Sequence, residues 1–189
     1  MDRLIDIIGA TVLWSFIVLI MLRVNAQISD NAFETLNTSI AQMEAIDLGS
    51  IVEFDFRKVG DLITGDKIII ADSNQTKFYF DYNFDGSTDS ISYSIGTTSD
   101  LSSTDNPNDK PLYRNFNNSS NIVGNISSFK LTYFDASGKQ INYGALSSQT
   151  NRDLIKTIQV YFLRESIYAN YDGFYVSMEW VRKISPKNI

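Results

Sequence analysis

A run of oxygen-bearing side chains between residues 81 and 89 has the spacing of a calcium-binding loop. The stretch is DYNFDGSTD, so that Asp81, Asn83, Asp85 and Asp89 occupy positions one, three, five and nine, with a glycine at position six. The glycine permits a sharp turn, and the main-chain carbonyl of Ser87 at position seven supplies a further oxygen. This spacing predicts calcium as a cofactor, with these five residues as its ligands.

The same loop departs from the EF-hand pattern at two points. Position twelve is Ser92 and not the glutamate that binds calcium through both oxygens, and predicted strands flank the loop where an EF-hand has helices. A remote carboxylate or a water molecule would have to complete the coordination, and binding would be weaker. The alternative interpretation is a hairpin turn whose Asp and Asn side chains accept hydrogen bonds from the loop backbone. The sequence leaves both interpretations open.

The composition excludes most of the common enzyme chemistries. The 189 residues contain no histidine and no cysteine, which removes the usual catalytic triads, thiolate nucleophiles and zinc sites. No set of acids, serines or glycines matches a known catalytic arrangement, so we predict that the protein is not an enzyme and assign no catalytic residue. The net charge of −6 disfavours nucleic acid as a partner.

A further acid, Asp6, lies at the edge of a long apolar segment. Residues 4–22 are almost wholly apolar, and at ~1.5 Å per residue a helix of this length approaches the ~30 Å thickness of the hydrocarbon layer. The acidic and basic start and the poor cleavage site at 24–26 favour a retained anchor over a secretory signal peptide. Asp6 is stabilised by the helix dipole and can pair with Arg3 in the same helix. Alternatively, it pairs with a positive group on a neighbouring subunit and sets the register of a helix bundle.

The helix is predicted to continue beyond the apolar segment as an amphipathic helix. Its apolar stripe recurs at three- and four-residue steps through Ile28, Ala32, Leu36, Ile40 and Met43, and is widened by Phe33 and Ile46. The residues Ile51, Val52, Phe56 and Val59 extend it to a stop at Gly60. Gly49-Ser50 is a candidate kink or break.

After Gly60 the apolar period changes to two, which predicts strands. The predicted strands are 67–72, 76–81, 89–95, 126–134, 154–165 and 173–184, with a weaker one at 112–116. We predict a tight turn at 135–138 and polar, mobile loops at 96–111 and 117–121. The fold class is therefore α+β: a long N-terminal helix, transmembrane in its first half and amphipathic in its second, packed on a mostly antiparallel β-sheet. The predicted parts are 1–25, a transmembrane segment; 26–60, its amphipathic continuation; and 61–189, an extracytoplasmic β-rich domain.

Several motifs, taken in order along the chain, resemble those of type IV pilins and type II secretion pseudopilins. Residues 3–6, Arg-Leu-Ile-Asp, resemble the Thr-Leu-Ile-Glu near the mature N-terminus of that family, which makes Asp6 the counterpart of its acid. The stretches 52–60 (VEFDFRKVG), 78–93, 128–138 (SFKLTYFDASG) and 155–160 (IKTIQV) resemble motifs of the PilW-type minor pilins and of the J-type pseudopilins. Together these motifs span nearly the whole chain.

The resemblance implies a structural subunit that assembles or primes a type IV pilus or a type II secretion pseudopilus through its N-terminal helix. Its partners would be other pilin or pseudopilin subunits, the inner-membrane assembly platform and membrane lipid. It would cross the cytoplasmic (inner) membrane once with its globular domain outside, or reside in an extracellular filament. Asp6 would neutralise the N-terminal amine of an adjacent subunit. The family carries a short leader ending in glycine, and only Met1 precedes Asp2, so we expect either a misassigned start or an unprocessed subunit.

A second hypothesis also accounts for the anchor and the acidic loop. It is a membrane-tethered extracytoplasmic binding or adhesion module whose binding depends on calcium. A lone tether needs no amphipathic helix packed on its sheet, and this feature separates the two hypotheses.

Overall fold

The computed structural model describes residues 2–170 and 173–189, so Met1, on which the expectation about the leader falls, lies outside them. The chain forms two compact units, one ending at Ser39 and the other running from Ile40 to Ile189. Helix α1 (Asp2–Arg57) begins in the first unit and ends in the second. Of the helices in the described residues, α1 is the one that is long and apolar enough to cross a membrane.

Hydroxyl side chains in the apolar part of α1 are satisfied within the helix itself. Thr11 Oγ1 donates to the carbonyl of Ile8 at 2.9 Å, and Ser15 Oγ donates to the carbonyl of Thr11 at 2.8 Å. An unpaired hydroxyl in hydrocarbon would cost free energy, and these local hydrogen bonds avoid that cost. The apolar part therefore tolerates both polar residues in a lipid-like environment.

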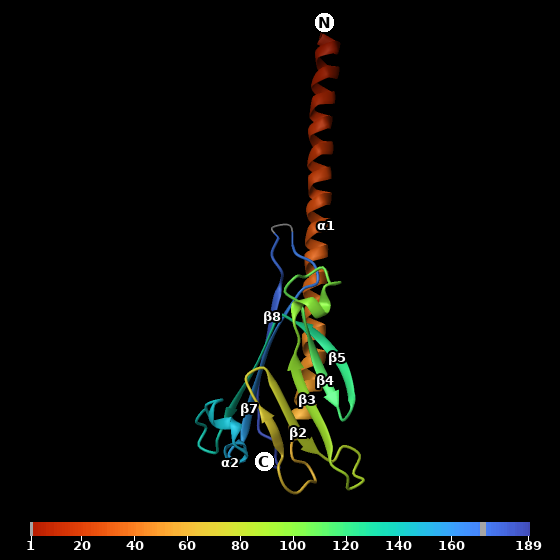
Figure 1. The fold of residues 1–189 in the computed structure, drawn as a ribbon. Helices are drawn as coiled ribbons and strands as arrows, with labels where there is room; N and C mark the ends of the chain where they lie inside the picture. The colour runs from red at the N-terminus through yellow and green to blue at the C-terminus, as the bar shows by residue number, and fades with distance from the viewer. Residues whose placement is uncertain (1, 171–172) are drawn as a thin grey trace. The chain divides into compact units, whose positions relative to one another are not determined.

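The second unit contains two antiparallel sheets, drawn in Figure 1. The strands of the larger sheet follow chain order and are β1 (Ile68–Ala71), β2 (Gln75–Phe80), β3 (Asp89–Ile95), β4 (Lys110–Phe116) and β5 (Ser119–Ile126). The smaller sheet is formed by β6 (Ser128–Phe134), β7 (Thr157–Glu165) and β8 (Ser177–Ile184). The predicted α+β class, with a long N-terminal helix and antiparallel strands, is confirmed; the single predicted sheet is instead two. The chain passes from one sheet to the other at Ser127, whose N–H donates to the carbonyl of Leu163 in β7 at 2.8 Å.

Both sheets and the C-terminal part of α1 share one apolar core. Among its largest fully buried side chains are Phe56 of α1, Phe78 and Tyr93 of the larger sheet, and Leu131 and Phe162 of the smaller sheet. The buried apolar side chains of α1 recur at three- and four-residue steps and are Ala41, Ala45, Leu48, Val52 and Phe56, and buried Val59 follows just after the helix. The N-terminal part of this buried inner face differs from the predicted apolar stripe. The stripe was predicted to include Ile40, Met43 and Ile46, and all three are exposed.

Gly49 neither breaks nor kinks the helix, since α1 runs through it without interruption. A Cβ atom at this position would lie only 2.3 Å from Nε1 of Trp180 in β8. The glycine is therefore required for the close approach of β8 to α1. The predicted stop at Gly60 is present: α1 ends at Arg57, and Gly60 has φ +75°, which favours glycine.

The two predicted polar loops are wrong in part. Residues 119–121 belong to β5, and the loop that precedes them is a tight turn in which Asn117 has φ +50°. Residues 110–111 begin β4, and the stretch before them contains a short 3-10 helix, η1 (Thr98–Leu101). Asn106 in the same stretch is buried and donates to Oε2 of Glu165 and to the carbonyl of Ser166. These segments are held in place by hydrogen bonds of polar side chains, so apolar periodicity does not reveal them in the sequence.

Candidate functional site

The five predicted calcium ligands lie in one loop, which connects β2 to β3. Asp81 is buried, and its two carboxylate oxygens accept the N–H groups of Phe84 and Gly86 at 2.7 and 2.9 Å. Asp89 closes the loop from the other end, where its Oδ2 accepts the N–H of Tyr82 at 2.9 Å. These contacts hold the loop in the shape that the hairpin interpretation predicts.

Asp85 and its neighbours form the tip of this loop. Its Oδ1 accepts the N–H of Ser87 at 2.7 Å, and its Oδ2 accepts the side-chain amide of Asn83 at 2.8 Å. The N–H of Ser87, and then the amide of Asn83, hold the pKa of the Asp85 carboxyl below its usual value, so the loop keeps this negative charge in mildly acidic solution. In the described part of the chain, no three His, Cys, Asp or Glu residues are grouped so that they could hold a metal ion. Calcium binding through Asp81, Asn83, Asp85, Ser87 and Asp89 stays a prediction.

Calcium titration tests this prediction directly. Titration of the full chain in detergent should give a heat of binding with a Kd of roughly 10⁻⁴–10⁻³ M, the weak end of the range for such loops. Asp85→Ala should remove this heat because it deletes the ligand at position five. Asp100→Ala is the matched control, since Asp100 is also an acid that accepts a backbone N–H in a turn. No heat at millimolar calcium would leave the loop with a purely structural role.

The acidic loop contacts the end of α1 through a lysine that lies among three aromatic rings. The Lys58 ammonium lies 4.6 Å from the ring centroid of Phe54, 4.7 Å from that of Tyr82 and 5.9 Å from that of Phe84. Phe84 is 68% exposed and has φ +62°, a backbone conformation that costs energy for a side chain of this kind. The cluster was not predictable, because its members come from two segments whose meeting has no local sequence signal.

A buried ionic network joins the inner face of α1 to the larger sheet. Asp55 is 1% exposed, and its carboxylate accepts Arg114 Nε at 2.6 Å, Arg114 Nη2 at 3.1 Å and the Tyr93 hydroxyl at 2.5 Å. Burial, followed by the negative charge of Asp55, raises the pKa of the Tyr93 hydroxyl, and the hydrogen bond to Asp55 raises the pKa of the Arg114 guanidinium. Both partners therefore stay protonated as donors to Asp55.

A second ionic contact joins α1 to β7. Arg164 of β7 is almost completely buried, donates to the carbonyl of Asn125 at 2.6 Å and pairs with Glu44 of α1. Its Nε is buried and has no hydrogen-bond partner among the residues that the structure describes. Arg164 and Glu44 line a cavity of about 250 Å³ between α1 and β5, to which Asp47 and Ile51 also contribute.

On the side of α1 away from the core, an exposed apolar face continues through the second unit. We call it the outer face; its residues, at steps of three and four, are Ile40, Met43, Asp47, Ile51 and Phe54 of α1 and Lys58 just after the end of the helix. Met43 is 65% exposed, and the other apolar members are also exposed. Among the residues that the structure describes, no cation pairs with Asp47. This face has the composition of a helix-packing surface with one carboxylate near its middle.

The two predicted assembly residues lie near the start of α1, in the first unit. Arg3 and Asp6 are both exposed, and no ion pair joins them within the described residues. Because Asp6 is not committed to Arg3, its carboxylate is open to another partner.

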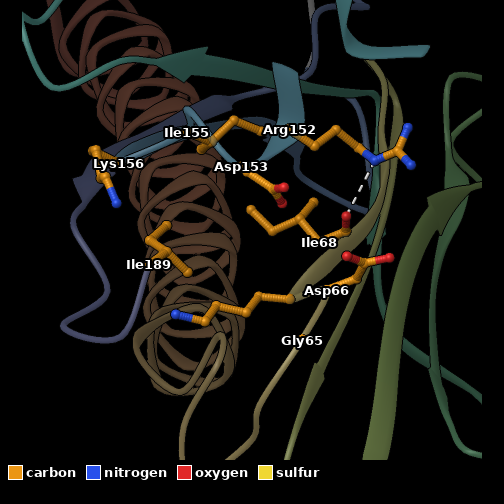
Figure 2. A pocket seen from close by; sticks show the side chains of 9 residues that line it. Gly65, Asp66, Ile68, Arg152, Asp153, Ile155, Lys156 and Ile189 are labelled. Carbon is orange, nitrogen blue, oxygen red and sulfur yellow. Dashed lines mark hydrogen bonds between the residues drawn. The ribbon is translucent and has the colours of Figure 1, made fainter. Parts of the chain in front are cut away.

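Figure 2 shows the pocket between β1 and the segment that follows α2 (Gln149–Arg152), with a volume of about 350 Å³. Arg152 Nε donates to the carbonyl of Ile68 at 3.1 Å, while Lys156 lies on the opposite side of the pocket. The other Arg152 contacts are also to neutral oxygens, the carbonyls of Leu146 and Ser147 and the side chain of Gln149. Arg152 therefore fastens α2 to the edge strand β1, and we assign it a structural role.

Comparisons of the chain with protein-family models, with curated proteins and with solved structures found no match. The fold and its contacts define the class of molecule: a β-rich domain built around the C-terminal part of one long helix, whose N-terminal part is apolar enough to cross a membrane.

Proposed function

We propose that the protein is a structural subunit, of the minor pilin or pseudopilin kind, that contributes to the assembly of a type IV pilus or a type II secretion pseudopilus. The apolar start of α1 anchors it in the cytoplasmic membrane with the β-rich domain outside. Its partners are other pilin or pseudopilin subunits and the inner-membrane assembly platform. The family resemblance in the sequence supports this proposal together with the outer face of α1.

The outer face is the single observation that carries the proposal furthest. A monomeric tether gains nothing from exposing Ile40, Met43 and Phe54 on a helix that is already held to its domain by the opposite face. Burying a large apolar side chain contributes roughly 1.5–3 kcal/mol, so a neighbouring helix that covered this face would stabilise a filament by several kcal/mol. An apolar surface of this kind typically marks a protein–protein interface.

Within such a filament, Asp6 has the role of a register residue. A carboxylate among apolar helices costs free energy unless a positive group neutralises it, so only arrangements that bring a cation to Asp6 are stable. The cation is the N-terminal amine or Arg3 of an adjacent subunit. Neutralisation thereby selects one axial position between neighbours.

Substitution of Asp6 tests the assembly role. Asp6→Ala should lower the amount of the chain recovered in sheared filaments about tenfold, which corresponds to ~1.4 kcal/mol of lost pairing, and Asp6→Glu should retain assembly. Immunoblotting of sheared and membrane fractions measures the change. The control is Asp100→Ala, an exposed acid outside α1 that takes no part in the proposed helix contacts, and it should assemble as the native chain does. Normal assembly of a folded Asp6→Ala chain would contradict the role.

The second candidate is the membrane-tethered binding or adhesion module that depends on calcium. The exposed Phe84 and Tyr82, next to the acidic carboxylates, favour it because exposed aromatic side chains frequently serve recognition. Cross-linking in membranes separates the two candidates. A filament subunit forms contacts between copies or with other subunits along α1, whereas a tethered module stays a monomer.

A further inference from the structure

The charged residues of α1 are arranged so that two segments of the helix complement each other. Between residues 4 and 56 of α1, Arg23 is the one cation, and the acids Asp30, Glu34, Glu44, Asp47, Glu53 and Asp55 follow it. Within the described residues, Glu44 pairs with Arg164 and Glu53 pairs with Arg57, while no ion pair is formed by Arg23, Glu34 or Asp47. Arg23, Glu34 and Asp47 are therefore exposed charges that form no ion pair with any residue the structure describes.

Residues 16–34 of α1 include a set of positions with the same sequence spacing as the outer-face residues. Phe16, Leu19, Arg23, Gln27, Asp30 and Glu34 follow one another at steps of three, four, four, three and four residues. The outer-face residues Ile40, Met43, Asp47, Ile51, Phe54 and Lys58 follow the same steps. If two copies of the helix lie side by side and one is shifted by 24 residues along the axis, Arg23 of the shifted copy lies level with Asp47 of the other copy, and Glu34 lies level with Lys58. Both of these positions bring opposite charges together. At the same shift, Phe16 and Leu19 lie level with Ile40 and Met43.

We propose that the outer face of one copy binds the segment 16–34 of α1 from a second copy, with Arg23 paired to Asp47 and Glu34 paired to Lys58. This inference rests on the proposed function and specifies the partner surface within it. The helices are parallel, because both copies enter the same membrane in the same direction. A displacement of 24 residues is about 36 Å along the axis at ~1.5 Å per residue. The contact forms only after one copy has moved outward, so it belongs to the filament and not to copies resting side by side in the membrane.

Both outer-face charges are suited to an interchain pair. Asp47 is exposed, lies between the apolar side chains of the outer face and lines the cavity beside β5, so an approaching helix would cover it. The ammonium of Lys58 lies over aromatic rings, which stabilise it without neutralising its charge. Glu44 is a poorer partner for Arg23 because Arg164 already holds it. Opposite charges that meet in a helix seam favour one register of the seam, since a register that separates them leaves each charge covered and unpaired.

Disulfide cross-linking tests this register, and the absence of cysteine from the chain makes single-cysteine variants clean probes. One full-length copy carries Leu19→Cys and a co-expressed copy carries Met43→Cys; oxidation in intact membranes should give a covalent dimer on gel electrophoresis. The matched control replaces Met43→Cys by Gln42→Cys, which is also exposed and at nearly the same height but about 100° around the helix. That pair should give at least tenfold less dimer.

Charge reversal tests the ion pair in the same assay. Arg23→Asp on the Leu19→Cys copy, or Asp47→Arg on the Met43→Cys copy, should each lower the yield of dimer about tenfold. The two reversals combined should restore the yield, whereas a merely structural role for either residue would not allow rescue. Asp47 is exposed and forms no ion pair within the described residues, so we expect its reversal to leave the fold intact, and circular dichroism of each chain checks this.

The outcomes separate this inference from the proposed function. Cross-links from Leu19→Cys to cysteines at Ile28 or Leu36, without one to Met43→Cys, would overturn the register and leave the filament subunit standing. The same holds if the charge reversals show no rescue. An absence of cross-links between copies at every one of these positions overturns both.

Discussion

Asp55→Ala should lower the free energy of unfolding of the β-rich unit by about 3–5 kcal/mol, the cost of removing one partner from a buried ion pair. The substitution leaves the Arg114 guanidinium and the Tyr93 hydroxyl without their shared acceptor at the junction of α1 and the larger sheet. Both donors must then find water in a packed interior or remain unpaired. Denaturant unfolding of the full chain in detergent, followed by tryptophan fluorescence, measures the loss.

A neighbouring acid provides the control. Glu53 lies two residues before Asp55 and pairs with Arg57 and Arg182, but those arginines are well exposed. Exposed ion pairs contribute about 0–1 kcal/mol, so Glu53→Ala should cost far less than Asp55→Ala. Equal losses for the two variants would mean that the Asp55 network does not hold the helix to the sheet.

The parts of the fold that could be predicted are those with a local cause. The α1 helix follows from apolar residues at helical spacing, and β2 and β3 follow from the alternation on either side of the acidic loop. The strand β5 has the sequence SSNIVGNI, which contains too few apolar residues for that signal. Its pairing with β4 forms it, and this pairing is a property of the folded chain.

The choice of inner face on α1 could not be predicted for a different reason. Ile40, Met43 and Ile46 satisfy helical spacing as well as Ala41 and Ala45 do, and they are more apolar. The two alanines are nevertheless the residues that are buried, whereas the three larger residues are exposed. Two apolar faces on one helix are expected of a subunit that packs first on its own domain and then on a neighbour.

The candidate sites divide in the same way. The acidic loop is local, so the sequence placed Asp81, Asp85 and Asp89 in one turn, and their contacts with backbone N–H groups accord with one of the two predicted interpretations. Asp55 belongs to the stretch 52–60, which resembles a family motif, but its partner Arg114 lies in β4, far along the chain. No spacing rule connects two such residues, and only the packing of α1 on the larger sheet reveals the pair.

Gly49→Ala should destabilise the protein by a net of about 1 kcal/mol, although alanine is the better helix former. In a free helix the change would gain up to ~1 kcal/mol. Here the added Cβ would lie 2.3 Å from Trp180 Nε1, and the indole cannot retreat easily because it stacks on the buried ring of Phe162 at a centroid distance of 5.0 Å. Overpacking of this kind typically costs about 1–3 kcal/mol and occasionally more, which outweighs the gain in propensity. Thermal unfolding of the full chain measures the net effect.

Two further variants separate overpacking from a general effect on the helix. Gly9→Ala adds the same methyl group to α1 at a position where, beyond the adjoining helix backbone, no described atom lies within 4 Å, and it should leave stability unchanged or raise it slightly. Removing the obstacle with Trp180→Ala should reverse the sign at the other position, so that Gly49→Ala stabilises that background by up to ~1 kcal/mol. If Gly49→Ala lowers stability equally with and without the indole, the close approach of β8 to α1 is not the reason that a glycine is needed at this position.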